Sequence, residues 1–220
     1  MNAEQAAVFI DGGFFDKIME DFAPPKKDTA GRNSEYFRLN YEKFANELCK
    51  LCEAKRLRTY YYHCKPIDDG SAFYKSRISF FNGLTRTPRL QFREGKLSKH
   101  RLLCRKKGCG ENLMCPKCKT EQWDIRQKRT DDLLIVDVVS LSWRGLINKV
   151  ILVGGDSEFV PSFKEAKEAG VITYVFYCNT KSGSCRIHDE LYDIFDERLE
   201  LTKELIVSCG EYKKAFEAKE

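Results

Sequence analysis

Two short apolar runs in this chain each lead to an aspartate that has glycines beside it. The run at 8–10 meets Asp11, which two glycines follow, and the run at 150–153 precedes two glycines and Asp156. Continuous apolar runs of this length are typical of strands that are buried on both faces of a sheet. Such strands need helices on both faces, and the carboxyl ends of parallel strands share one edge, where ligands bind. We therefore expect the two aspartates to meet at that edge.

The rest of the chain alternates between helical and strand patterns. We predict helices at 14–22, 40–55, 71–84, 131–146, 157–169, 187–195 and 199–218. Further strands are predicted at 57–64, 89–97 and 171–177, and a loop at about 24–34. This alternation indicates an α/β fold with a mostly parallel sheet and helices on both faces.

The composition restricts the class of protein. A hydrophobic content of 42% is enough for a buried core, and no run of about 18 apolar residues is present, so we expect no membrane partner. The first residues lack the basic and apolar regions of a signal peptide. Ten cysteines without such a signal favour reduced thiols or metal ligands over disulfides, and we expect a cytoplasmic protein. The three histidines show no ligand spacing and are interpreted as structural or surface residues.

The strand-end aspartates predict a cation site. Asp11 and Asp156 would repel each other at one sheet edge unless a cation lay between them, and carboxylate oxygens suit Mg²⁺ or Mn²⁺. Asp131 and Asp132 open a predicted helix, and Glu158 follows closely, so these acids could complete the set. Stabilisation of a helix N-terminus is the alternative for Asp156, Asp131 and Asp132. For Asp11 we expect no capping role.

Asp137 is unusual because its neighbours on a helix include Leu133, Leu134 and Leu141. A buried and unpaired carboxylate is costly. We therefore expect Asp137 to face either the acidic site or a buried partner.

Positive charge is concentrated in the middle of the chain. Residues 86–129 carry fourteen Lys or Arg and four Asp or Glu, whereas the whole chain has a net charge of +5. Such a segment is either a solvated basic loop or a surface for phosphates, and we favour nucleic-acid binding. The candidate contacts are Arg101, Arg105, Lys106, Lys107, Lys117, Lys119, Lys128 and Arg129, with Ser157 beside the acids.

The same segment contains four closely spaced cysteines: Cys104, Cys109, Cys115 and Cys118. Four thiolates could close a structural Zn²⁺ site, and the alternative is four free thiols in a loop. Zinc would let a short basic insertion, residues 98–123, fold without a core of its own. We interpret the other cysteines as small core residues: Cys49, Cys52, Cys64, Cys178, Cys185 and Cys209.

Three segments together resemble the NYN-domain proteins, a branch of the PIN-like nucleases. They are FIDGGFF at 9–15, KRTDDLLIVDVVSL at 128–141 and ILVGGDSEFVPSFKEAKEAG at 151–170, and the last is the most specific. The resemblance covers about residues 5–195 and implies a PIN-like, Rossmann-like sheet. We expect this domain over residues 5–197, with the insertion at 98–123 inside it and a C-terminal helical tail at 198–220. It also implies an acidic cluster that binds Mg²⁺ or Mn²⁺ and hydrolyses phosphodiesters, usually in RNA.

The resemblance assigns catalytic roles by position to five acids: Asp11, Asp131, Asp137, Asp156 and Glu158. The metal ligands among them are Asp11, Asp131 and Asp156. Glu158 stands where relatives more often have Asp, and its longer side chain changes its reach. Gly13 and Phe14 stand where many relatives have Asn, so a contact made by that Asn is not transferred.

We therefore predict a metal-dependent nuclease and favour an endoribonuclease. The expected partner is nucleic acid, and we expect RNA rather than DNA. A non-catalytic nucleic-acid-binding module that uses the basic insertion is the alternative. A phosphatase of the haloacid-dehalogenase type ranks lower, because that chemistry needs a second Asp where this chain has Gly13. The C-terminal stretch from Leu199 is either a packing helix or a contact in a homodimer.

Overall fold

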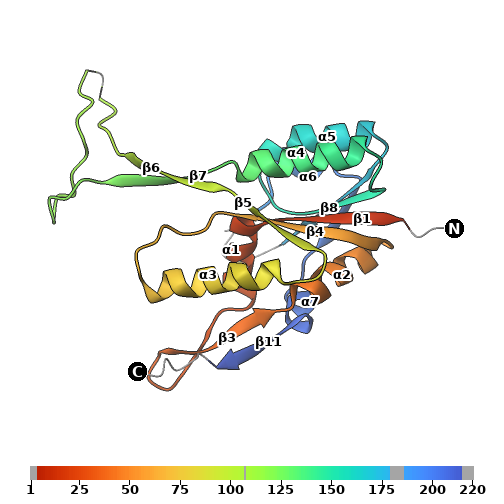
Figure 1. The fold of residues 1–220 in the computed structure, drawn as a ribbon, viewed down its shortest axis with the longest axis horizontal. Helices are drawn as coiled ribbons and strands as arrows, with labels where there is room; N and C mark the ends of the chain where they lie inside the picture. Colours follow the sequence, from red (N-terminus) through yellow and green to blue (C-terminus); the bar gives the residue numbers. More distant parts are fainter. Residues whose placement is uncertain (1–3, 107, 179–185, 215–220) are drawn as a thin grey trace.

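The computed structural model describes residues 4–106, 108–178 and 186–214, and all structural statements refer to these ranges. The centre of the protein is a six-stranded sheet in which every pairing is parallel. The strands follow the order β10 (Glu197–Glu200), β9 (Ile172–Tyr177), β8 (Lys149–Val153), β1 (Gln5–Asp11), β4 (Lys55–His63) and β5 (Leu90–Glu94). The predicted α/β fold is confirmed (Figure 1).

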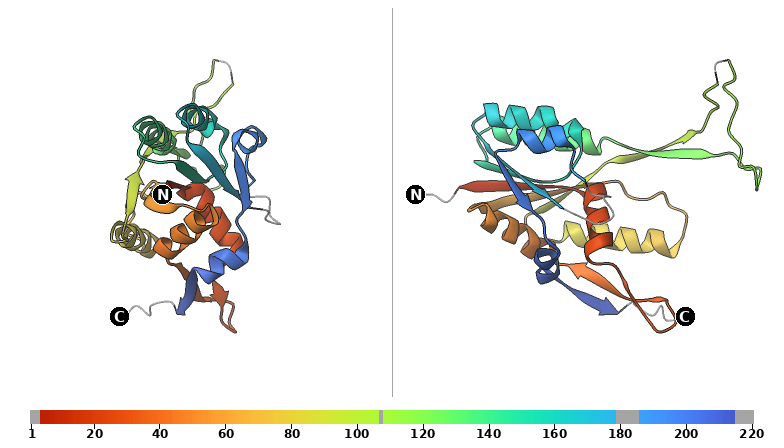
Figure 2. Two further views of the ribbon diagram at one scale, coloured as in Figure 1. Left: turned by 90° about the vertical axis from the view of Figure 1, so that its right-hand side faces the viewer. Right: turned by 180° about the vertical axis from the view of Figure 1, so that it is seen from behind.

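Helices cover both faces of this sheet (Figures 1 and 2). One layer contains α4 (Thr130–Trp143), α5 (Val160–Glu168) and α6 (Asp189–Ile194), and the other contains α1 (Gly12–Phe22), α2 (Tyr41–Leu51), α3 (Ala72–Thr85) and α7 (Lys203–Ser208). None of the described helices has the length and apolar character needed to cross a membrane.

Two buried clusters hold the helix layers to the sheet, because alternate residues of a strand face opposite sides. In β1, Val8 and Ile10 belong to the cluster that includes α1 and α2 side chains. Ala7 and Phe9 of the same strand belong to the cluster under α4 and α5. All four side chains are fully buried, so β1 anchors both layers and fixes the position of Asp11 at its end.

The C-terminal stretch differs from its prediction. A helix at 199–218 is wrong for the described residues, which form the end of β10, the six-residue α7 and then β11 (Gly210–Lys214). β11 pairs with β3 (Asn33–Leu39), which also pairs with β2 (Lys26–Lys27), so a small antiparallel sheet forms. A Cβ atom on Gly210 would meet the Phe37 ring at 2.5 Å and the Arg38 carbonyl oxygen at 2.6 Å. Close pairing with a distant strand has therefore overridden local helical propensity.

A long arm leaves the sheet between β5 and α4. It is an antiparallel ribbon of β6 (Lys96–Arg101) and β7 (Trp123–Lys128). The predicted strand at 89–97 is thus divided at Gly95 into β5 and β6. The arm projects beyond both helix layers and ends in two separate tips (Figures 1 and 2). Since β5 is parallel to β4, and β4 to β1, the arm starts from the same sheet edge as Asp11.

The junction between β1 and α1 is closely packed. The helix begins at Gly12, directly after Asp11 and two residues before the predicted start at 14. A Cβ atom on Gly12 would lie 2.5 Å from the His63 ring and 2.7 Å from the Tyr62 carbonyl oxygen. Glycine is therefore needed here because the end of β4 lies against it, and the close packing brings His63 beside the predicted acidic site.

Candidate functional site

Two acids meet at the carboxyl edge of the sheet, as predicted. Asp11 is the last residue of β1, and Asp156 follows the adjacent strand β8 by three residues. The two groups are close enough for the charge of Asp156 to contribute to a raised pKa of Asp11. A Cβ atom on Gly155 would lie 2.5 Å from the Phe14 ring, so this glycine lets the loop with Asp156 approach α1.

Asp131 adds a carboxyl group from the first turn of α4. Its pKa is raised to about 6, and burial is the largest cause. The other causes are the charges of nearby acids: Asp11, Glu158, Asp156 and Asp132. The structure therefore brings together acids from β1, from α4 and from the segment after β8, which are far apart in the sequence.

Asp11 has a capping role that the sequence analysis did not expect. Its Oδ1 atom accepts hydrogen bonds from the backbone N–H groups of Gly13, at 3.0 Å, and Phe14, at 3.3 Å. Burial raises the pKa of Asp11, and these hydrogen bonds and the charge of His63 oppose that rise. Among the described residues none donates to Oδ2, so this oxygen is available to a ligand.

Asp156 and Glu158 are both exposed and lie at the short 3-10 helix η1 (Ser157–Phe159). Asp156 Oδ1 accepts a hydrogen bond of 3.0 Å from the backbone N–H of Glu158, so the capping alternative from the sequence holds here. A carboxylate has several lone pairs, and capping through one oxygen leaves the other free to bind a ligand. The predicted helix at 157–169 is divided into η1 and α5.

Asp137 has the buried partner that the sequence analysis named as one of two options. Its oxygens accept hydrogen bonds of 2.7 and 2.6 Å from the Arg93 guanidinium and one of 2.9 Å from the Tyr62 hydroxyl. The side chain of Asp137 is only 14% exposed. The ion pair therefore joins α4 to β5, and the hydroxyl adds a link to β4.

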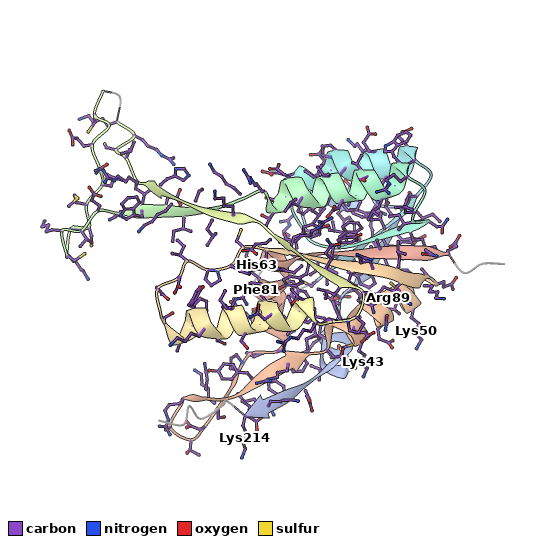
Figure 3. The ribbon with its side chains drawn as sticks, viewed as in Figure 1. Lys43, Lys50, His63, Phe81, Arg89 and Lys214 are labelled. Atoms are coloured by element: carbon purple, nitrogen blue, oxygen red, sulfur yellow. The ribbon has the colours of Figure 1, made fainter. Side chains whose placement is uncertain are left out.

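His63, Asp16 and Arg77 form a charged group beside Asp11 that the sequence analysis missed. His63 Nε2 lies 3.2 Å from Asp16 Oδ2, and Arg77 contacts Asp16 at 2.8 Å and His63 at 3.2 Å. Burial by itself would raise the pKa of Asp16, but the contacts with His63 and Arg77 outweigh burial and lower this pKa. His63 lies close to Phe81, between the sheet and α3 (Figure 3). The sequence could have revealed His63 through its position, because this residue ends β4 at the same sheet edge as Asp11.

The predicted nucleic-acid contacts lie on the arm and at its base. Five of them are exposed on the distal arm: Arg101, Arg105, Lys106, Lys117 and Lys119. Lys107 lies outside the described residues. Lys128 and Arg129 are exposed at the base, next to the start of α4. Ser157 lines a pocket of about 430 Å³ beside Asp156, which Arg186 and His188 also line.

The four cysteines of the arm are free thiols that the structure does not assemble into one site. The two tips of the arm point away from one another (Figure 1). The bridge between Leu103 and Asn112 encloses the first pair in sequence, and the bridge between Met114 and Glu121 encloses the second. Within one pair, the pKa of Cys118 is lowered to about 7, chiefly by hydrogen bonds from Thr120 and also by Cys115. In this arrangement Cys115 and Cys118 could supply two of the four ligands of a zinc site. The predicted core residues are buried as expected: Cys49, Cys52, Cys64, Cys178 and Cys209. Cys185 lies outside the described ranges.

An ion of Mg²⁺ or Mn²⁺ fits the chemistry of the acidic cluster. The donors are carboxylate oxygens, and a cation would remove the repulsion that contributes to the raised pKa of Asp131. In the described part of the chain, no three His, Cys, Asp or Glu side chains already surround one point as metal ligands do. The acids would therefore move closer together around a bound ion.

Comparison with known proteins identifies the family. The NYN-domain model matches residues 5–195, which include β1, the arm, α4 and the segment with Asp156. No curated protein matches the chain.

The raised pKa of Asp131 makes the stability of the metal-free protein depend on pH. The folded protein retains this proton to about pH 6, whereas the unfolded chain loses it near pH 4, so folding stability should fall as the pH rises through this range. Asp131→Asn removes the effect, so in EDTA its melting temperature should exceed that of the wild type by more at pH 7 than at pH 4. Asp132→Asn, in the same helical turn, controls for the helix dipole. An equal difference at both pH values would contradict this account.

Proposed function

This chain belongs to the NYN-domain family, and we propose that it is a metal-dependent nuclease that hydrolyses phosphodiester bonds in RNA. NYN domains are part of the PIN-like ribonuclease group. The observation that carries the proposal is the convergence of acids around Asp131, whose pKa is raised to about 6 by burial and by these nearby charges. Perturbed acids of this kind are typical of functional sites, and at neutral pH a divalent cation is the ligand that best relieves their repulsion.

Asp11, Asp131 and Asp156 would hold Mg²⁺ or Mn²⁺, and Glu158 lies near enough to contribute. Such an ion, when bound, stabilises charge on a phosphoryl group and lowers the pKa of a bound water. The chain itself places the ligands. Backbone N–H groups of α1 hold one oxygen of Asp11, and the Glu158 N–H holds one oxygen of Asp156.

We assign Asp137 a positioning role rather than a ligand role. Both of its oxygens are bound by Arg93, and Tyr62 donates a further hydrogen bond. A metal ion would have to compete with that ion pair for the same carboxylate. Held in this way, Asp137 fixes α4 against the sheet, and α4 carries Asp131.

The basic residues at the base of the arm support a nucleic-acid substrate. Lys128 and Arg129 directly precede α4 and are exposed, so a phosphate backbone that they bind lies next to Asp131. Ser157, which directly follows Asp156, adds a hydroxyl to the lining of the pocket. The preference for RNA over DNA comes from the family.

Asp11→Asn and Asp156→Asn are each expected to lower cleavage of labelled RNA, with Mg²⁺ or Mn²⁺ present, by about a hundredfold. The affinity for RNA in EDTA should not fall in either variant, because no phosphate-binding cation is removed. Glu168→Gln is a matched control, since it removes one exposed carboxylate from the far end of α5. Labelled DNA, tested in parallel, measures the preference between the two nucleic acids.

Persistent cleavage by both Asn variants would show that the acids do not form the active site. RNA binding without cleavage by the wild type would favour the alternative, a binding module that uses the basic arm. Hydrolysis of a phosphomonoester without cleavage of RNA would instead support a phosphatase.

We also propose that Zn²⁺ joins the two cysteine pairs of the arm. The proximity of Cys115 and Cys118, with the lowered pKa of Cys118, supplies half of a ligand set. Elemental analysis should then find about one zinc ion per chain. A four-cysteine site requires that Cys104→Ser/Cys109→Ser and Cys115→Ser/Cys118→Ser both lose the ion. Retention of zinc by the first double variant would show that Cys104 and Cys109 are not ligands. A wild type without zinc would contradict the proposal.

A further inference from the structure

One face of the β6–β7 ribbon carries an exposed aromatic ring among cations. Residues opposite each other in the antiparallel register share a face, so Arg101 faces Trp123 and Lys99 faces Ile125. The Lys99 Nζ atom lies 4.5 Å from the centre of the Trp123 ring, and the Arg101 guanidinium lies 5.3 Å from it. Trp123 is nevertheless 39% exposed and Ile125 is 55% exposed. A large apolar surface therefore meets water with positive charges at its border.

The two connections of the ribbon, to β5 and to α4, set the position of this face relative to the acids. The ribbon leaves β5 through Gly95 and returns to α4 through Arg129, two residues before Asp131. Trp123 and Lys128 are the two ends of β7, so they are roughly 17 Å apart at the usual rise of a strand. A ligand that follows this face from Trp123 to the base of the ribbon is therefore led towards the acidic cluster.

We propose that Trp123 stacks on an unpaired base, and that the arm thereby selects single-stranded nucleic acid for the acidic site. Aromatic rings bind single strands by stacking on exposed bases, and neighbouring cations bind the phosphates on either side. In a duplex the faces of the bases are covered by their neighbours, so the ring has no partner of this kind. The inference rests on the proposed function for the class of ligand and adds the strandedness of the substrate.

Trp123→Ala is expected to lower the affinity for an oligouridine of roughly 12 nucleotides about tenfold or more, measured by anisotropy in EDTA so that no cleavage occurs. Trp123→Phe keeps an aromatic ring and should retain most of the affinity. Trp143→Ala is the matched control, because Trp143 is 58% exposed at the end of α4 and hydrogen-bonds Glu165 rather than the arm. The affinity for a duplex of the same length should change little in all three variants.

Fluorescence tests the contact itself. The chain has two tryptophans, so Trp143→Phe leaves Trp123 as the only one. Its emission should be quenched as the single strand is added, in proportion to the bound fraction, and should be quenched much less by a saturating duplex.

Equal affinity of the wild type and Trp123→Ala for the single strand, or equal quenching by the duplex, would overturn the proposal. So would quenching that accompanies self-association at higher protein concentration, since the face would then bind a second copy of this chain. These measurements need no catalysis. Stacking without cleavage by the wild type would therefore contradict only the proposed nuclease function. Cleavage without an effect of Trp123→Ala on binding would contradict only the proposed stacking.

Discussion

Mutual repulsion between carboxylates is the constraint on which the rest of the site depends. Asp11, Asp131 and the pair Asp156 and Glu158 come from three separate parts of the chain, yet they lie close enough that burial and their charges together raise the pKa of Asp131 to about 6. Repulsion of this kind opposes folding unless a proton or a cation compensates it. The fold must therefore hold the acids in place against their own charge.

Several independent contacts provide that restraint. The fully buried strand β1 is anchored in both hydrophobic clusters, and Asp11 continues it. Close packing at Gly12 holds the start of α1 against the end of β4, and close packing at Gly155 holds the loop with Asp156 against Phe14. The ion pair between Asp137 and Arg93 links α4 to the edge strand β5, so the helix that carries Asp131 is tied to the sheet by charge as well as by apolar contacts. The arm starts from the carboxyl edge of the sheet, which places the cations at its base, Lys128 and Arg129, next to the helix that carries Asp131.

The sequence predicted the features that follow from local patterns. Buried apolar runs gave the parallel sheet, and Asp11 and Asp156 could be placed at its carboxyl edge because parallel strands end there. Asp137 was recognised as a residue that needed a partner, but Arg93 lies on a different element and could not be chosen from spacing alone. The Asp16–His63–Arg77 group was missed for the same reason, since it joins α1, β4 and α3. Local propensity also failed at Gly210, where pairing with β3 decides the conformation.

The most direct test of the central claim is the number of protons released when Mn²⁺ binds. With a pKa of about 6, Asp131 carries about half a proton at pH 6 in the metal-free protein, and a ligand carboxylate must lose it. Calorimetric titrations with Mn²⁺ at pH 6, in two buffers of different ionisation enthalpy, measure that release. The account predicts a release of about half a proton for the wild type and weaker binding with a clearly smaller release for Asp131→Asn. Equal affinity and equal release in the two proteins would contradict it.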